Sequence, residues 1–373
     1  MTQAFLPFVR PDIDEPTIAA VAEVLRSGWI TTGKHAANLE QALSRLVGGR
    51  EVRVMTSATA ALEIALLVAG VGPGDEVLVP ALSFVASANV ILRVGARPVF
   101  VDVSIDTRNI DLDQVEAAIT PRTKAIMPVH FAGLPVDLDR LYALATAHKL
   151  RVVEDAAHAI GSAWHGTLIG ARGDLVCFSF HPNKTITSIE GGAIVLSDAT
   201  EAATVELHRF HGLKRDSESE SEVTLAGGKA NLTDVAACVG LGQLARLTEF
   251  IERRQHLVAR YFDRLAGWQL GVLPPRGDKG HSWHLMTVLL PFERLGMTRG
   301  AFIRAMRAEG IGVGIHYSAI PEFELYRKLG YRPELYPQAV RIGRETVSLP
   351  LFPAMTDADV DRVCATLRRV TGS

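Results

Sequence analysis

Short runs of β-branched and apolar residues alternate with longer segments of helical pattern between residues 52 and 197. The runs predicted as strands are VLVPA at 77–81, PVFVDV at 98–103, AIMPVHF at 125–131, RVVEDA at 151–156, LVCFSF at 175–180 and AIVLS at 193–197. Between them, apolar residues recur at helical spacing over 58–70, 83–94, 111–119 and 137–149. This alternation is typical of an α/β fold, so we expect βα units around a mostly parallel sheet.

The pattern changes after residue 212. Residues 212–229 are rich in Ser, Glu and Gly, and they predict an exposed, mobile loop. A long helical stretch over 234–266 follows. Strand and helix patterns then mix over WHLMTVLLP at 283–291, a helix near 298–309, IGVGIHY at 311–317 and a final helix over 356–370. We therefore expect a large α/β domain over residues 1–250 and a small α+β domain over residues 251–373.

The composition is that of a soluble globular protein, with 48% hydrophobic and 21% charged residues among 373. No stretch approaches the roughly 20 uncharged apolar residues of a membrane span, and no secretion signal opens the chain, so we expect a cytoplasmic protein without a membrane partner. The net charge of -2 provides no basic field for nucleic acid. Three distant cysteines indicate reduced thiols, and the histidines lack metal-binding spacing, so no metal is expected.

Lys184 lies in the segment SFHPNKTITSIEGG, which follows a strand that is apolar on both faces. Its amine is therefore expected at the carboxyl end of that strand, where open α/β sheets bind ligands. A lysine there can form a Schiff base with an aldehyde cofactor if its surroundings favour the neutral amine. A lone lysine in a loop is usually a surface residue. The neighbouring Ser179 and His181, and the tight turn at 190–192, favour the cofactor role.

Asp155 ends the predicted strand RVVEDA, and its carboxylate is expected to point into the same crevice. Pyridoxal 5′-phosphate (PLP) is an aldehyde cofactor that needs an anion against its protonated pyridine nitrogen, because that charge makes the ring an electron sink. An Asp at such a position is also a common helix N-cap. Both interpretations of Asp155 stay open from the residues alone.

The segment MTSATAALEIAL opens a helix with Thr56, Ser57, Ala58 and Thr59. Small hydroxyl residues and free backbone N–H groups at a helix N-terminus make a site for phosphate, and ordinary capping explains the same composition. Phe84, in PALSFVAS, begins the next helix and could stack on a planar ring, although taken alone it is a typical core residue.

These motifs together resemble the PLP-dependent sugar aminotransferases of the DegT/DnrJ/EryC1/StrS family. The resemblance extends over nearly the whole chain, through SGWITTG, TSATAAL, GPGDEVLVPALSFVASAN, ITPRTKAIMPVH, VVEDAAHAIGS, FSFHPNK, EGG and LPLFP. It implies an α/β fold of the aspartate aminotransferase type (fold type I), with a large domain of mostly parallel sheet and a small C-terminal α+β domain. It also implies a homodimer with active sites at the subunit interface.

The resemblance assigns roles to individual residues. Lys184 would carry the cofactor and shuttle the proton, Asp155 would pair with the pyridine nitrogen, and His158 would contact the ring's phenolic oxygen. The remaining cofactor contacts it implies are a phosphate site at Ser57, Ala58 and Ser179 and a stacking side chain at Phe84. Some relatives have histidine in place of the lysine and act as dehydratases, so Lys184 indicates amino transfer.

One subgroup of the family resembles this chain more closely. Its pattern is similar to GYKYNLTD, and here GGKANLTD places Lys229 where other members have an Asn that reaches the neighbouring subunit's cofactor phosphate. A cation can serve that phosphate as a point charge. The subgroup includes the enzyme that makes UDP-4-amino-4-deoxy-L-arabinose for lipid A modification in lipopolysaccharide biosynthesis. Aminotransferases for UDP-, dTDP- or GDP-linked 6-deoxy ketosugars share most of these motifs and remain alternatives.

The implied reaction has two halves, in which L-glutamate gives its amino group and a 4-keto nucleotide sugar receives it. The sugar site would draw on Trp29, Thr31 and Thr32 and on the pair His316 and Tyr317, although His316 could equally be a structural histidine. Two other readings are a PLP-dependent lyase or desulfurase and a non-catalytic PLP-binding sensor. A desulfurase would need a mobile cysteine, whereas Cys177 lies in a strand predicted to be buried. A sensor would be expected to carry a DNA-binding module, and the sequence shows none.

Overall fold

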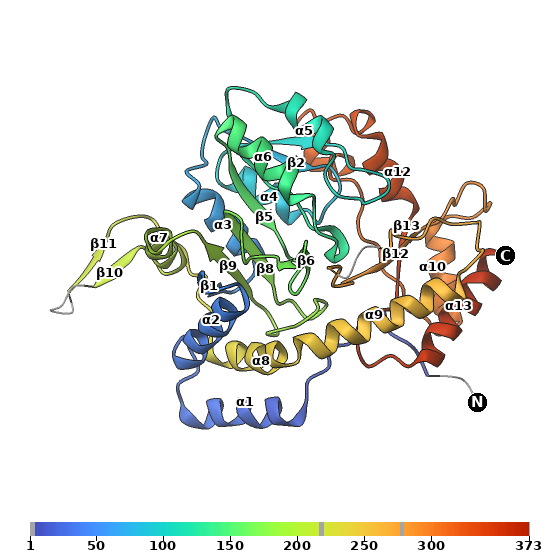
Figure 1. Cartoon of the computed structure of the whole chain (residues 1–373), viewed down its shortest axis with the longest axis horizontal. Coiled ribbons are helices and arrows are strands. Elements are labelled where there is room, and N and C mark those ends of the chain that lie inside the picture. Colours follow the sequence, from blue (N-terminus) through green and yellow to red (C-terminus); the bar gives the residue numbers. More distant parts are fainter. Residues whose placement is uncertain (1–3, 216–219, 277–279, 373) are drawn as a thin grey trace.

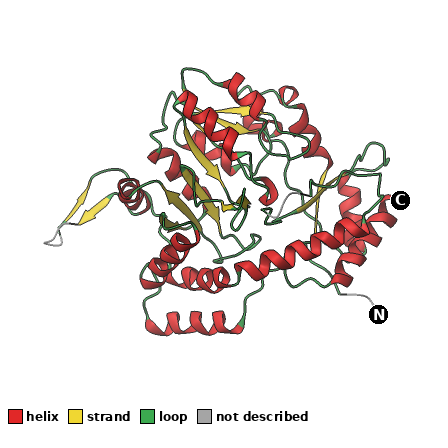
Figure 2. Ribbon diagram, viewed as in Figure 1, coloured by secondary structure: helices red, strands yellow, loops and turns green. Residues whose placement is uncertain are grey.

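A seven-stranded sheet with the strand order β1-β9-β8-β5-β4-β2-β3 forms the centre of the protein. The computed structural model describes residues 4–215, 220–276 and 280–372. Strands β3, β2, β4, β5 and β8 are parallel, and β9 is antiparallel to both β8 and β1. The strands are β1 (Glu51–Met55), β2 (Glu76–Pro80), β3 (Arg97–Val101), β4 (Thr123–Ile126), β5 (Arg151–Asp155), β8 (Leu175–Ser179) and β9 (Gly192–Leu196). The expected α/β fold with a mostly parallel sheet is confirmed (Figure 2).

Helices surround this sheet, and the four expected between residues 58 and 149 are all present, each slightly shorter than the pattern predicted. Helix α3 lies against β9, β8 and β5, whereas α2 contacts β1 and α8. The elements of this part are α1 (Glu15–Ser27), α2 (Lys34–Leu46), α3 (Ala58–Val68), α4 (Ala86–Arg93), α5 (Leu112–Ala118), η1 (Phe131–Gly133), α6 (Leu138–His148), β6 (Ala163–Trp164), β7 (Thr167–Leu168), α7 (Ala199–Arg209) and α8 (Asp234–Ala245).

Strand β8 shows why the central strands are apolar throughout. Its residues Leu175 and Cys177 belong to a core cluster shared with α3 and α4, whereas Val176 and Phe178 belong to a second cluster shared with α2 and α6. Successive side chains of a strand point to opposite faces, so a strand covered on both sides must be apolar at every position. Polar side chains are thereby confined to the ends of these strands.

A second group of elements lies beside the sheet, with its own core cluster. Strands β12 and β13 pair antiparallel within it, and α9 runs along its edge. This cluster draws on α9 (Leu247–Arg264), β12 (Met286–Leu289), α10 (Arg299–Ala308), β13 (Thr346–Leu349) and α13 (Asp357–Thr371). The other C-terminal elements, η2 (Ile320–Glu322), α11 (Glu324–Lys328), η3 (Pro333–Leu335) and α12 (Pro337–Glu345), lie between α10 and β13 in the sequence, and Ile320, Tyr326 and Ile342 from them belong to the core cluster of α3 and α4. We propose that these C-terminal elements together form the small domain over residues 251–373. Leu6 adds an N-terminal segment to it by pairing with Ile311.

Two sequence expectations need correction. The helical stretch expected over 234–266 is two helices, α8 and α9, separated at Arg246, whose guanidinium contacts Asp12 and Glu249 at 2.8 and 2.9 Å. The stretch 212–229 is exposed as expected, but it contains the strands β10 (Leu213–Arg215) and β11 (Ser221–Val223), which project from the body as a two-stranded arm (Figure 1). Cross-strand pairing outweighs the low hydrophobicity of this segment.

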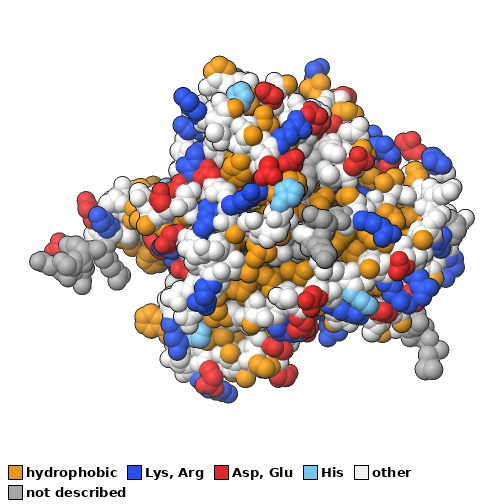
Figure 3. Space-filling model, viewed as in Figure 1, with side chains coloured by type: hydrophobic (Ala, Val, Ile, Leu, Met, Phe, Trp, Pro, Cys, Tyr) orange, Lys and Arg blue, Asp and Glu red, His pale blue; other side chains and the backbone are white. Residues whose placement is uncertain are grey.

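Charged side chains of both signs are interspersed over the face shown in Figure 3, and hydrophobic side chains gather near its centre. Within residues 4–215, 220–276 and 280–372, no helix has the length and apolar character needed to cross a bilayer. In the same ranges, no three metal-ligating side chains converge as a candidate metal site.

Candidate active site

A cavity of about 380 Å³ opens at one edge of the central sheet. Strands β5 and β8 end there, β9 begins there, and the turn after β1 leads from the same edge into α3. The cavity is lined by Ser57, Ala58, Thr59, Leu62, Ser83, Phe84, Ala86, Val129, Asp155, Ala157, His158, Ser179, His181, Asn183, Lys184, Glu190, Gly191, His316 and Tyr317. Most of the residues predicted from sequence therefore meet in one place.

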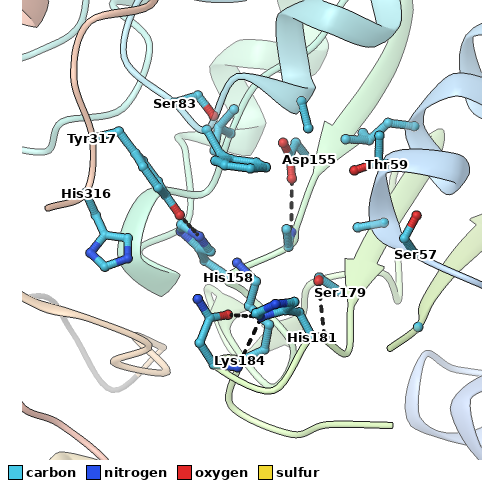
Figure 4. A pocket seen from close by; sticks show the side chains of 18 of the residues that line it. Ser57, Thr59, Ser83, Asp155, His158, Ser179, His181, Lys184, His316 and Tyr317 are labelled. Atoms are coloured by element: carbon cyan, nitrogen blue, oxygen red, sulfur yellow. Dashed lines mark hydrogen bonds between the residues drawn. The ribbon is translucent and has the colours of Figure 1, made fainter. Parts of the chain in front are cut away.

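Lys184 and Asp155 face this cavity from neighbouring strand ends (Figure 4). The turn that carries Lys184 follows β8, and the backbone N–H of Lys184 donates to the carbonyl of His181 at 2.9 Å. Burial of the amine lowers the pKa of Lys184 to about 8, against the opposing attraction of the Asp155 carboxylate. About a tenth of such an amine is neutral at pH 7, and only the neutral amine attacks an aldehyde.

The rate at which Lys184 captures PLP is therefore expected to rise with pH through about 8 and to level off above it. The rate rises with pH because the protonated amine, which predominates below the pKa, has no free electron pair. Stopped-flow absorbance of cofactor-free protein mixed with PLP over a pH series measures this rate. A rise centred near 10.4, the ordinary lysine value, would contradict the assignment of a buried amine.

The Asp155 carboxylate is held by two hydrogen bonds. The Ser87 hydroxyl donates to it at 2.7 Å and the backbone N–H of Ala157 at 3.1 Å. Burial raises the pKa of Asp155, and these two donors and the Lys184 charge oppose that rise. No helix begins at Asp155, since residues 156–162 form turns, so the N-cap interpretation is not supported.

Ser87 was missed by the sequence reasoning. It lies in α4 and also forms a 2.9 Å hydrogen bond with Ser83, so two hydroxyls stand in line behind the carboxylate. The signal in the sequence was a polar Ser within the segment SFVAS, at the start of a predicted helix; in the structure this side chain, Ser87, is 0% exposed. A buried hydroxyl needs a partner, and only the fold shows that the partner is Asp155.

The N-terminus of α3 forms one wall of the cavity. Ser57 is its N-cap, and its hydroxyl oxygen accepts from the N–H of Ala60 at 3.1 Å, which leaves the N–H groups of Ala58 and Thr59 at the cavity edge. A Cβ on Gly192 would lie 2.4 Å from the backbone N of Ala58. The second glycine of the EGG motif is therefore required for β9 to pass this close to the helix N-terminus.

His158 and Tyr317 stand opposite α3 (Figure 4). The Nδ1 atom of His158 accepts from the N–H of Ala132 at 3.2 Å, so in the neutral ring the proton resides on Nε2, which lies 3.1 Å from the Tyr317 hydroxyl. Burial, followed by the charges of Lys184 and His316, lowers the pKa of His158 well below its usual value. His158 is thus a neutral N–H donor at the cavity.

His316 and Phe84 complete the opposite wall. The Nδ1 atom of His316 lies 2.7 Å from the Ser348 hydroxyl, and its ring stacks on Phe8 with centroids 5.2 Å apart. Burial lowers the pKa of His316 to about 4, so the ring is neutral at physiological pH. Phe84 is 54% exposed, at the cavity mouth, with its ring centroid 5.8 Å from that of Tyr317. Its exposure argues against a core role.

The other predicted residues lie outside the cavity, in a separate cluster of their own. Trp29 is 61% exposed, and its indole N–H donates to the carbonyl of Thr32 at 3.1 Å. The amide of Asn231 links the Thr32 hydroxyl to the Lys229 amine, and the carbonyl of Thr31 accepts from the N–H of Asp234 at 3.1 Å. The chain therefore places these four predicted residues together, but not beside Lys184.

The donor set of the cavity fits the cofactor expected from sequence. A helix N-terminus suits a phosphate, a buried carboxylate suits a protonated pyridine nitrogen, and a lysine amine suits an aldehyde. The absence of a Cβ on Gly192 leaves the backbone of α3 open to an anion. Cys177, the residue a desulfurase reading would need, is 0% exposed inside β8 and does not line the cavity.

Three solved structures of aminotransferases superimpose on the chain. Spr1654 from Streptococcus pneumoniae, described as a sugar aminotransferase and seen in its PMP form, has a TM-score of 0.93 and 34% identity, covering 99% of this chain and 98% of that chain. Helicobacter pylori PseC, an aminotransferase involved in the biosynthesis of pseudoaminic acid, has a TM-score of 0.93 and 28% identity, covering 99% of both chains. DesI, solved in the presence of its TDP-sugar product, has a TM-score of 0.89 and 31% identity, covering 100% of this chain and 94% of that chain.

A family model also matches the sequence directly. The match to the DegT/DnrJ/EryC1/StrS aminotransferase family runs over residues 11–368, and so includes both the sheet and the C-terminal elements. The motifs read from sequence, the fold and the cavity agree with this match. The chain belongs to the DegT/DnrJ/EryC1/StrS aminotransferase family.

Proposed function

We propose that the protein is a PLP-dependent aminotransferase that moves the amino group of L-glutamate to a 4-keto nucleotide sugar. The main support for this proposal is that Lys184, Asp155 and His158 line one cavity together with the N-terminus of α3. Spr1654 is known in both PMP and PLP forms, which are the two states of such a cofactor. A non-catalytic sensor is disfavoured because the lysine, the carboxylate and a substrate-sized space occur together.

PLP, when bound, stabilises the negative charge left on the substrate carbon that loses its proton. Asp155 would supply the anion that keeps the pyridine nitrogen protonated, with its position held by Ser87 and Ala157. The Nζ atom of Lys184 would take the proton from the amino-bearing carbon of L-glutamate as a general base, for which a pKa near the working pH is favourable. The N–H of His158 would donate to the phenolic oxygen and orient the ring.

The amino acceptor is identified by its class. His316 and Tyr317 form the wall that faces the cavity opposite α3, and we assign it to the sugar ring. The Lys229 pattern favours UDP-4-keto-arabinose, whose amino product serves lipid A modification. A dTDP-linked ketosugar is the second candidate, because DesI was solved with a TDP-sugar product. The three free cysteines fit a reducing compartment, so we place the reaction in the cytoplasm.

We further propose that the active enzyme is a homodimer with shared sites. Lys229, Trp29 and Thr32 do not line the cavity of Lys184 in their own chain, so they would complete the cavity of a second copy. A second hollow adjoins the cavity, and Glu190 lines both of them. The exposed side chain of Ile189 also lines this hollow. An exposed apolar border of this kind suits a protein interface.

Absorbance spectroscopy tests the proposed function. Protein incubated with PLP is expected to show a yellow band that L-glutamate bleaches and that one 4-ketosugar, out of a UDP-, dTDP- and GDP-linked panel, restores. Such a result would name the acceptor, because the restored band reports completion of the second half-reaction. A band that persists through L-glutamate and every sugar would contradict the aminotransferase and favour the sensor.

A further inference from the structure

A second, much smaller cavity lies behind Lys184. Its volume is about 10 Å³, and Lys184 borders both this cavity and the large one in front. The small cavity is lined by Val9, Arg10, Pro11, Asp12, Pro182, Lys184, Thr185, Thr187, Gln243, Phe250, Arg254 and Pro353. That volume is at the lower limit for holding one water molecule, and the lining includes several polar groups.

Two residues of this lining each have a buried polar atom without a hydrogen-bond partner among the described residues, the Oγ1 atom of Thr185 and the Nε atom of Arg254. Thr185 is 4% exposed and Arg254 is 1% exposed, so bulk water reaches neither. Buried polar groups in folded proteins nearly always have a partner. Both atoms belong to residues that border the same cavity, which is therefore where a shared partner would bind.

Arg254 is held through one end of its guanidinium. It lies on α9, and its Nη1 atom donates to the carbonyls of Trp283, His284 and Leu351 at 3.2, 3.2 and 3.0 Å. These carbonyls anchor two loops, one of which is the LPLFP motif. The ring of His284, in the other loop, packs on His158 with centroids 4.4 Å apart. Arg254 thus supports the cavity from behind, while its buried Nε–H has no partner among the described residues.

The turn after Lys184 is anchored at its far end but not beside the lysine. The Thr187 hydroxyl donates to the carbonyl of Phe180 at 3.0 Å, and its backbone N–H faces the side-chain oxygen of Gln243 at 3.4 Å. At Thr185, directly after the lysine, no such anchor is present among the described residues. A bridging group at the small cavity would supply the missing anchor.

We propose that the small cavity binds one water molecule, which accepts from the Nε–H of Arg254 and exchanges a hydrogen bond with the Thr185 hydroxyl. Thr185 and Arg254 are accordingly positioning residues: they fix the turn that carries Lys184 and so the direction of its amine. Bridging waters of this kind are part of a fold and are enthalpically similar to direct hydrogen bonds. The role in catalysis rests on the proposed function of Lys184.

A crystal structure of the PLP-loaded wild-type enzyme tests the site without any substitution. Electron density for a water within hydrogen-bond distance of both Thr185 Oγ1 and Arg254 Nε is the expected result. A dry cavity at a resolution where other buried waters are visible would overturn the proposal. This outcome is independent of which sugar the enzyme uses and of whether Lys184 transfers a proton.

Thr185→Val removes the hydroxyl and keeps the shape, so it tests the positioning role. We expect kcat to fall about tenfold, since small misplacements of a reacting group are costly, while KM for L-glutamate changes by less than about twofold. The circular dichroism of the bound cofactor's absorbance band, which reports its orientation, should weaken. Thr185→Ser should restore both, and Thr204→Val, on α7, controls for the same chemical change elsewhere.

Equal kcat and equal circular dichroism in Thr185→Val and wild type would overturn the positioning role. Should Thr185→Val fail to fold, the wild-type crystal structure remains decisive for the site. A failure of the proposed function has another sign, namely that Lys184→Ala retains activity, and that result leaves the water site untouched.

Discussion

A Lys184→Ala variant is expected to lose the absorbance of covalently bound cofactor and at least about 1,000-fold of the aminotransferase rate. The methyl group of alanine can neither bind the aldehyde nor carry a proton, and within residues 4–215, 220–276 and 280–372 no second lysine lines the cavity. Fluorescence-detected thermal unfolding should show a protein at least as stable as wild type, because removing a buried amine removes its desolvation cost. The measurements are an absorbance spectrum with PLP and a coupled assay of 2-oxoglutarate release from L-glutamate.

Lys124→Ala is the matched control for this variant. Lys124 is an exposed lysine on β4, away from the cavity, and its loss is expected to leave spectrum and rate unchanged. Lys184→Arg adds a second comparison, since an arginine keeps the charge but cannot be deprotonated. Lys184→Ala with wild-type activity would remove the basis of the proposed function, whereas Lys184→Arg should resemble Lys184→Ala.

An Asp155→Asn variant is expected to bind PLP and to lose about 100- to 1,000-fold in kcat. The substitution keeps the size of the side chain and one hydrogen-bond acceptor for Ser87. It removes the negative charge opposite the pyridine nitrogen, and the loss of this charge weakens the electron sink. Because catalysis is impaired more than binding, KM for L-glutamate should change little. Single-turnover absorbance after addition of L-glutamate measures the affected step.

The pH dependence of the aminotransferase rate tests the role of Asp155 independently. Burial raises the pKa of Asp155, so the carboxylate is lost as pH falls, and the wild-type rate should decrease on the acid side. Asp155→Asn has no carboxylate to protonate, so this part of its acid limb should disappear. Ser87→Ala, which removes one hydrogen bond to the charged form, should move the wild-type acid limb to higher pH. An Asp155→Asn rate within about threefold of wild type would exclude the pyridine role.

The sequence by itself determined the fold class and most of one wall of the site. Strands that are buried on both faces have to be continuous apolar runs, and the helices between them have to carry apolar residues at helical spacing, so both are visible in the chain. Polar residues at the ends of such runs, as at Asp155 and Ser179, stand out because the core excludes them elsewhere. Motifs such as EGG are visible for a similar reason, since Gly192 has no room for a side chain.

Other features depended on distances between residues far apart in the chain, which periodicity does not encode. The partnership of Ser87 with Asp155 crosses two elements, and the separation of α8 from α9 depends on contacts of Arg246 with Asp12 and Glu249. The lowered pKa of Lys184 likewise comes from burial that only the assembled cavity produces.

The local pattern of the chain thus determined which elements form and which residues end them, because burial acts on each strand and helix separately. The tertiary structure decided which of those ends meet. It brought Lys184, Asp155 and His158 to one cavity and left Trp29, Thr31, Thr32 and Lys229 in another cluster. It also placed Thr185 and Arg254 on one small cavity, 69 positions apart in the chain. The physical reason is that hydrogen bonds and charges act over a few ångströms of space, whatever the distance along the sequence.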